Sequence, residues 1–287
     1  MLTDILEVLA CPQCSGSLTL ADNTLRCDSG HSFDVARQGY VNLLPGRANS
    51  STADTTAMVA ARKEFLDGGH FAPITAAVIS AARAAVPDDV AGTVLDAGAG
   101  TGYALATLLD AMPSRTGVAL DISKFAARVA AHSHERIGSI VADVWARLPL
   151  RDDCAALVLD IFSPRNAEEF ARVLVPGGTL IVVTPNNEHL AELVGPLELI
   201  TIDPRKRERL SVKLGSEFEQ IAEQLVTYPL TLSRADAIAA AAMGPSAAHV
   251  SMTELTRRVD TLDDPVAVTV SVTVGTYRAC TKEVADA

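Results

Sequence analysis

The sequence predicts an α/β protein with a Rossmann-like fold and a small zinc-ribbon-like module at its N-terminal end. Hydrophobic residues make up 48% of the 287-residue chain and aromatic residues only 4%, so the core is mainly aliphatic. Parallel strands that are buried on both faces have this composition. Aliphatic runs that end in acidic residues follow one another after residue 93, and three of the five cysteines lie in the first 27 residues. We expect a module at 1–45, a linker at 46–57 and the α/β domain at 58–287.

The module contains two pairs of residues that suit zinc. Cys11 and Cys14 form a Cys-x2-Cys knuckle, and Cys27 with His31 follows thirteen residues later. Three thiolates and one imidazole would complete a tetrahedral site without an open position, which indicates a structural ion. The residues between the pairs alternate in polarity around Asp22-Asn23 and predict a short hairpin. The metal would supply stability that so small a core cannot.

The segment after the knuckles mixes aromatic, basic and amide side chains over residues 33–45. Such a segment suits an RNA-facing surface, or equally a strand that packs the module on its neighbour. Residues 46–57 are rich in Ser, Thr, Ala and Asn and are typical of a linker.

The α/β domain begins with two predicted helices, 58–66 and 73–86, and a strand at 93–95. That strand leads into a glycine-rich turn, which contains Asp96, Gly98, Gly100, Thr101 and Gly102. Glycines between a strand and a helix let a ligand approach the backbone closely at a helix N-terminus. A carboxylate at the position of Asp96 would repel a pyrophosphate, but it suits the cationic methionine end of S-adenosylmethionine.

The next two predicted strands also end in acidic residues. Strand 117–120 ends at Asp121, where a carboxylate can bind both ribose hydroxyls, and strand 138–142 ends at Asp143. Asp143 and Val144 would offer an acceptor and an apolar surface to an adenine ring. Together these strand ends favour an S-adenosylmethionine site, and a nicotinamide-binding Rossmann domain is the alternative.

The remaining segments complete a class I methyltransferase fold with a seven-stranded, mostly parallel sheet. We expect strands at 155–160, 179–183, 227–233 and 266–277, a turn at 175–178, and helices at 168–174, 186–194, 206–223 and 235–243. The expected strand order is 3-2-1-4-5-7-6 with an antiparallel last strand. The basic run from Arg205 to Arg209 fits an RNA contact or a solvated helix face.

Charge and hydropathy limit the classes of partner. The formal net charge of −11 disfavours a whole-surface attraction to nucleic acid, although a local basic patch is compatible with it. No apolar run reaches the roughly 18–20 residues that a membrane span needs. We therefore expect no membrane partner and a cytoplasmic location.

The combination of motifs resembles the RlmA family of ribosomal RNA guanine-N1 methyltransferases. The resemblance rests on the four zinc-type residues, on the run from Gly39 to Pro45, on Phe65-Leu66-Asp67-Gly68-Gly69-His70, on Val94-Leu95-Asp96 with its glycines, and on Leu120-Asp121-Ile122-Ser123-Lys124. It covers most of the chain from Cys11 to Val194.

The resemblance implies methyl transfer from S-adenosylmethionine to N1 of a guanine in a hairpin of large-subunit ribosomal RNA. It also implies a zinc module that helps to grip RNA, a contact of Ile122 with the cofactor, and a homodimer. The loop after the fourth strand of similar methyltransferases faces the transferable methyl group, which makes Asp160 and Ser163 the candidate catalytic residues.

One segment departs from the family. Residues 243–249 carry Ser and Ala where the family tends to have aromatic and basic residues suited to a base. Two alternatives therefore stay open, a methyltransferase of a small molecule such as a sugar, and a protein that binds S-adenosylmethionine or RNA without turnover.

Overall fold

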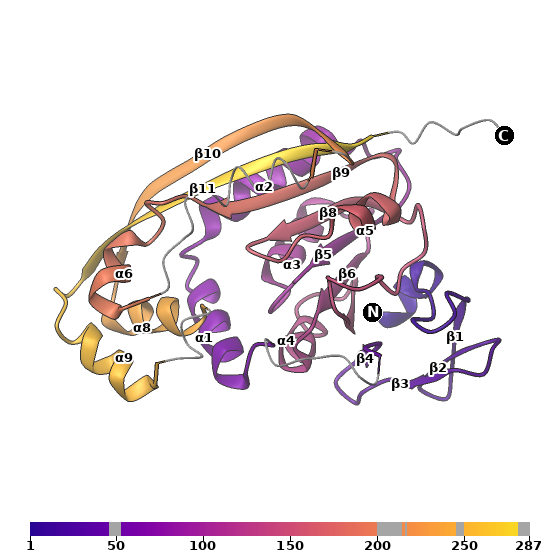
Figure 1. Ribbon diagram of the computed structural model, residues 1–287, viewed down its shortest axis with the longest axis horizontal. Helices are drawn as coiled ribbons and strands as arrows, with labels where there is room; N and C mark the ends of the chain where they lie inside the picture. The colour runs from indigo at the N-terminus through magenta and orange to yellow at the C-terminus, as the bar shows by residue number, and fades with distance from the viewer. Residues whose placement is uncertain (46–52, 200–213, 216, 245–249, 281–287) are drawn as a thin grey trace.

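The computed structural model describes residues 1–45, 53–199, 214–215, 217–244 and 250–280. Within these ranges the chain forms one large mixed sheet, covered by helices on both faces, and one small sheet near the N-terminus (Figure 1). Among the described helices, none has the length and apolar character that a bilayer span requires. The basic run at 205–209 lies outside the described residues.

The large sheet has the strand order β10-β11-β9-β8-β5-β6-β7-β4. Its strands are β4 (Tyr40–Asn42), β5 (Thr93–Ala97), β6 (Gly117–Asp121), β7 (Ile137–Val141), β8 (Ala155–Ile161), β9 (Leu174–Pro185), β10 (Phe218–Leu232) and β11 (Val266–Ala279). From β7 to β10 this is the predicted order 3-2-1-4-5-7-6, and β11 is antiparallel to β9 as expected. The described sheet has an eighth strand, because β4 pairs in parallel with β7 at the edge.

Two predicted segments differ in the structure. The expected turn at 175–178 lies inside β9, where the register with β8 shifts and Gly177 has a φ of +71°. The helix predicted over 206–223 is wrong for its last six residues, because β10 already begins at Phe218. Ile221 and Leu225 have helical spacing, but pairing along β11 makes the segment a strand.

Hydrophobic clusters cover both faces of the large sheet. One cluster contains side chains of α1 (Thr56–Asp67), α2 (Ala72–Ala85), α3 (Tyr103–Ala111), α6 (Ala191–Leu197), α8 (Arg234–Ala242) and α9 (Met252–Val259). The other contains α5 (Ala167–Val173) and much of the N-terminal segment. The N-cap of α4 (Lys124–Ala130) is Ser123, which follows β6. The α/β sandwich therefore places the carboxyl ends of the parallel strands at one edge, where ligands bind in such sheets.

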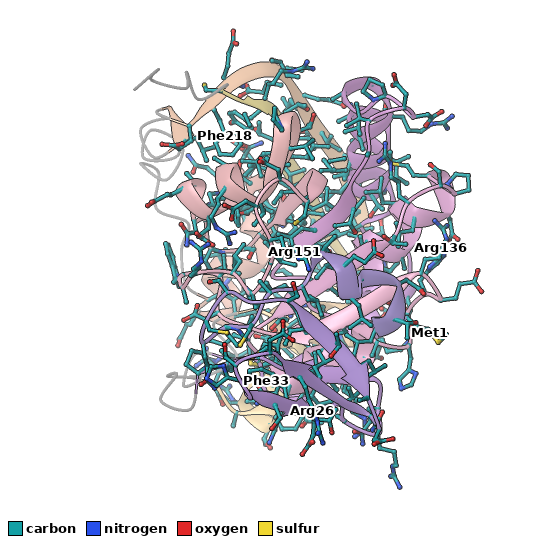
Figure 2. The ribbon with its side chains drawn as sticks, turned by 90° about the vertical axis from the view of Figure 1, so that its right-hand side faces the viewer. Met1, Arg26, Phe33, Arg136, Arg151 and Phe218 are labelled. Atoms are coloured by element: carbon teal, nitrogen blue, oxygen red, sulfur yellow. The ribbon has the colours of Figure 1, made fainter. Side chains whose placement is uncertain are left out.

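The N-terminal segment packs directly on the large sheet. It consists of a 3-10 helix, Leu2–Val8, and of the antiparallel strands β1 (Leu18–Ala21), β2 (Thr24–Cys27) and β3 (Ser32–Asp34). Ile5 is so close to β7 that a Cβ on Gly138 would lie 2.4 Å from it. Figure 2 views this end of the molecule, with Arg26 and Phe33 from the small sheet and Arg151 beside it. Residues 40–42 thus act as the strand that packs the module on its neighbour.

Candidate cofactor site and metal centre

The glycine turn after β5 requires glycine at three positions. Gly98, Gly100 and Gly102 have φ values of +89°, +55° and +77°, in the region that side chains disfavour. A Cβ on Gly98 would lie 2.0 Å from the Oγ of Ser163, and one on Gly102 would lie 2.5 Å from a neighbouring hydroxyl. The turn from β5 into α3 therefore has no room for side chains at these glycine positions. Thr101 within it is buried.

Asp121 at the end of β6 fixes the shape of the turn. Its carboxylate accepts hydrogen bonds from the backbone N–H groups of Gly100 and Ser123, both at 2.8 Å. Burial raises the pKa of Asp121, although these two hydrogen bonds act in the opposite direction. The half-buried Ile122 follows directly. The carboxylate and the glycine backbone thus form one connected unit.

Asp96 is the most deeply buried acidic group of this unit. It is only 2% exposed, and burial, together with the charge of Asp121, raises its pKa to about 7. No hydrogen bond within the described ranges reaches its carboxylate. A carboxyl group buried at such a cost indicates a functional position.

The third strand end is engaged in its own turn. Asp143 accepts a hydrogen bond from the backbone N–H of Trp145 at 2.9 Å, and the buried Val144 lies between them. Asn166 donates to the carbonyl of Val144 at 2.9 Å. This ties the loop after β7 to the loop after β8.

An arginine that the sequence analysis did not predict as a site residue lies over the glycine turn. Arg62 of α1 is close enough to Gly100 that a Cβ there would lie 3.3 Å from its guanidinium. Arg62 also forms an ion pair with Asp54 and donates to the carbonyl of Met243 at 2.8 Å. Ser123 donates to the Asp54 carbonyl at 2.7 Å. No local sequence signal marks Arg62, because its neighbours come from distant segments.

The two candidate catalytic residues point in different directions. Asp96 pairs with Leu159 in register, so these two side chains share a face, and Asp160 points to the opposite one. The fully buried Asp160 lies 3.7 Å from the guanidinium of Arg165. Ser163, by contrast, lies against the glycine turn, and its buried Oγ has no hydrogen-bond partner among the described residues.

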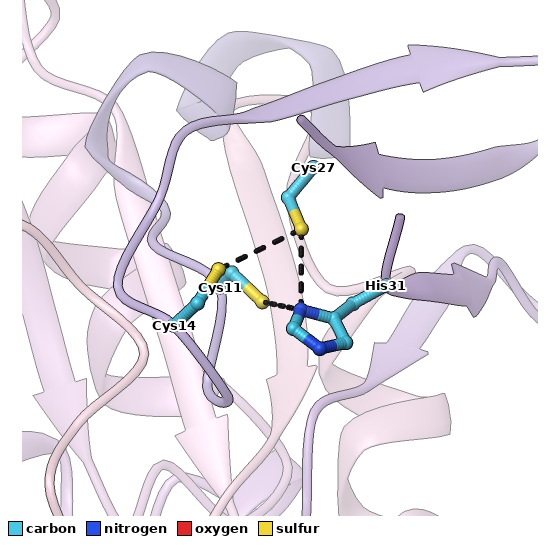
Figure 3. Close-up of side chains that lie close together, drawn as sticks. All are labelled: Cys11, Cys14, Cys27 and His31. Carbon is cyan, nitrogen blue, oxygen red and sulfur yellow. Dashed lines mark hydrogen bonds between the residues drawn. The ribbon is translucent and has the colours of Figure 1, made fainter. Parts of the chain in front are cut away.

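Four side chains at the N-terminus form a compact cluster of potential metal ligands. The ligand atoms of Cys11, Cys14, Cys27 and His31 all lie within 4.8 Å of one another, and Figure 3 shows the side chains pointing together. The Sγ atoms of Cys14 and Cys27 are 3.7 Å apart, and His31 Nδ1 lies 3.3 Å from Cys27 Sγ. Zinc–sulfur bonds of about 2.3 Å would place tetrahedral ligands roughly 3.7 Å apart.

Backbone turns hold this cluster in shape. Ser15 donates to the Cys11 carbonyl at 2.8 Å, and Gly30 donates to the Cys27 carbonyl at 3.0 Å. A hydrogen bond from the backbone of Gly16 lowers the pKa of Cys14 to about 6, which favours the thiolate that a metal binds. Distances and donor types therefore both fit zinc.

Comparisons with known proteins agree with this arrangement. The N-terminal domain model of RlmA matches residues 9–52, and a methyltransferase domain model matches residues 94–178. The chain is 46% identical to the 23S rRNA (guanine(748)-N(1))-methyltransferase of Streptomyces fradiae, across 95% of this chain and 97% of that protein. The chain belongs to the RlmA family.

Two further relatives extend the similarity. A protein of Micromonospora griseorubida, named for guanine-N1 methylation of 23S rRNA, is 47% identical over 96% of this chain and 98% of its own length. A Bacillus subtilis protein named for the same reaction is 35% identical over 65% of this chain. This RlmA protein is an S-adenosylmethionine-dependent methyltransferase with an N-terminal zinc ribbon.

Proposed function

We propose that this RlmA protein methylates N1 of a guanine in a hairpin of large-subunit ribosomal RNA. The observation that carries the proposal is sequence identity of 46–47%, over nearly the full length, to two proteins named for this reaction. The folded glycine turn and the ribbon cluster support it, because both parts of the family frame are present in one chain. The cytoplasm, where ribosomal RNA is found, is the proposed location.

The residues around the glycine turn fit S-adenosylmethionine. Asp96, buried without a hydrogen-bond donor among the described residues, suits the ammonium group, and Asp121 suits the ribose hydroxyls. Arg62, which lies over Gly100 and pairs with Asp54, is the proposed cation for the methionine carboxylate. Gly98 and Gly100 allow close approach to the backbone.

The other cofactor contacts come from the neighbouring strand ends. We assign Gly102 and Thr101 to the turn that supports the cofactor, and Ile122, Asp143 and Val144 to the adenosine end. Cys11, Cys14, Cys27 and His31 are the proposed zinc ligands. The zinc would keep the ribbon folded and docked on β7.

The reaction requires that guanine N1 loses a proton. When bound, S-adenosylmethionine supplies a methyl group on a sulfonium, which is an electrophile. Transfer of that methyl group would exchange the S–C bond for an N1–C bond, with S-adenosylhomocysteine as the leaving group and the N1 proton released to solvent. A base within a helix must leave the stack to reach such a site. Protein groups that favour the N1 anion, or that orient the base, therefore accelerate the transfer.

The loop after β8 is the part of the chain best placed for this task. Ser163 remains the proposed substrate contact, because its Oγ lies at the glycine turn. For Asp160 the geometry supports a bracing role instead, in which the carboxylate holds Arg165 and thereby the loop. Replacing Asp160 by Asn should then loosen the loop without changing the protonation of the base.

The test is transfer of radiolabelled methyl groups to unmodified large-subunit ribosomal RNA, with a small-molecule extract as the parallel acceptor. Label in the RNA would support the proposal. Label only in the small-molecule fraction would contradict the RNA substrate and leave a small-molecule methyltransferase. The family resemblance also implies a homodimer, and analytical ultracentrifugation of the zinc-loaded chain tests that part separately.

A further inference from the structure

An exposed phenylalanine lies at the end of β8, next to the glycine turn. Phe162 has 40% of its surface exposed and a φ of +56°. Bulky residues rarely adopt this conformation, and those that do are concentrated at functional sites. The Phe162 amide donates to the carbonyl of Val183 at 3.2 Å, which helps to hold the backbone there. The fold thus presents this ring to solvent at the strand end.

Two other rings lie close to that of Phe162. The ring centroid of Phe162 lies 6.1 Å from that of Phe71 and 5.7 Å from that of His189. Phe71 and His189 are themselves 5.7 Å apart. Phe71 is buried at the start of α2, and His189 is half-buried in the segment after β9. We call these three rings the aromatic platform, with Phe162 as its exposed member.

The aromatic platform lies on the cofactor side of the sheet. Phe71 belongs to the same hydrophobic cluster as Leu159, whose side chain shares a face with Asp96. Ser163, the next residue after Phe162, lies against Gly98. A planar ligand stacked on Phe162 would therefore lie beside the glycine turn.

His189 adds a hydrogen-bond donor to the aromatic platform. The backbone N–H of Ser271 donates to Nδ1 of His189 at 3.4 Å, which favours the neutral tautomer that carries its proton on Nε2. Burial lowers the pKa of His189 to about 4, which keeps the ring neutral at pH 7. Hydrogen bonds within the described residues leave Nε2 free. A neutral donor matches a carbonyl oxygen that gains negative charge during reaction.

We propose that the aromatic platform is the subsite for the target base, with the unstacked guanine on Phe162 and its O6 within reach of His189 Nε2. This inference rests on the proposed function. Aromatic faces replace the stacking that a base loses when it leaves a helix. When N1 loses its proton, part of the charge moves to O6, where the imidazole donor stabilises it.

The first test distinguishes the effect of the aromatic ring of Phe162 from the effect of its apolar volume. Phe162→Leu keeps an apolar side chain, Phe162→Tyr keeps the ring, and Leu225→Ala removes an exposed apolar side chain far along the sheet, on β10. We expect kcat/KM for a guanine-containing hairpin to fall at least tenfold in Phe162→Leu. It should stay within threefold of wild type in the other two variants. The Kd for S-adenosylmethionine, measured by calorimetry, should be unchanged in all three.

The second test examines the hydrogen-bond donor, the Nε2–H group of His189. His189→Phe keeps an aromatic ring without the N–H, and His189→Gln keeps an amide donor. We expect His189→Phe to lower kcat at least tenfold with KM within threefold, and His189→Gln to recover part of the loss. A 2-aminopurine at the target position is quenched while it is stacked in the RNA. We expect it to stay quenched on binding His189→Phe, which keeps the Phe162 face, and to brighten on binding Phe162→Leu, which does not.

Failure of the base subsite and failure of RNA methylation give different results in these experiments. If the wild-type protein methylates the hairpin and Phe162→Leu matches it in kcat/KM and in 2-aminopurine quenching, the base subsite is elsewhere and the function stands. If the wild-type protein transfers no methyl group to RNA, the proposed function fails, and the subsite for guanine fails with it.

Discussion

Replacing Asp96 by Asn should stabilise the cofactor-free protein and weaken its binding of S-adenosylmethionine. Asn has the shape of the protonated carboxyl group without its charge. Burial and the charge of Asp121 raise the pKa of Asp96 from 3.8 to about 7. At 1.36 kcal/mol per pKa unit, the ionised carboxylate costs the folded protein about 4 kcal/mol.

The sign of the pH dependence follows from linkage. A carboxyl group with a raised folded-state pKa binds its proton more tightly when folded, so wild-type stability falls as pH rises from 3.8 towards 7. Above pH 7 this contribution levels off. The stability difference between Asp96→Asn and wild type should therefore grow by about 2 kcal/mol from pH 5.5 to pH 8.

Urea unfolding of both proteins, zinc-loaded and without cofactor, measures this difference across the pH range. Calorimetry at pH 8 should show at least a tenfold loss of S-adenosylmethionine affinity in the variant. A pH-independent stability difference would refute the claim that the buried Asp96 carboxylate destabilises the cofactor-free protein. Wild-type cofactor affinity in Asp96→Asn would refute the claim that this carboxylate binds S-adenosylmethionine.

Three further predictions address the metal centre and the packing. Cys14→Ser should reduce bound zinc from one ion per chain and lower Tm, measured by elemental analysis and calorimetry, and full zinc content in the variant would contradict the ligand set. Gly98→Ala should abolish cofactor binding, because its Cβ would lie 2.0 Å from Ser163 Oγ, and binding by equilibrium dialysis tests this. Gly138→Ala should destabilise the protein by about 1–3 kcal/mol through the contact with Ile5, and unchanged urea unfolding would show that the N-terminal helix yields freely.

Much of the fold follows from local patterns. Buried aliphatic runs ending at Asp96, Asp121 and Asp143 predict the parallel strands and their shared edge, since such runs need two covered faces. The strand β4 was not predictable as part of the large sheet, because three residues at 40–42 carry no register signal of their own. Their pairing with β7 depends on the docked ribbon. The strand at 218–223 resembled a helix, because its exposed charged residues obscure the two-residue period.

The site is predictable only where its residues are close in sequence. The glycine turn and the Cys-x2-Cys knuckle are local, and the structure brings their members together. Phe71, Phe162 and His189 come from three separate segments, so only the folded sheet reveals their contact. The orientation of Asp160 is set by the alternation of β8, which pairs Leu159 rather than Asp160 with the face of Asp96.

The most direct test of the account is reverse transcription of unmodified 23S ribosomal RNA after incubation with the zinc-loaded protein and S-adenosylmethionine. A methyl group on guanine N1 blocks base pairing, so the account predicts one enzyme-dependent stop beside a hairpin guanine, with 1-methylguanosine in the digested RNA. Complete read-through, with no 1-methylguanosine by mass spectrometry, would contradict the proposed RNA substrate.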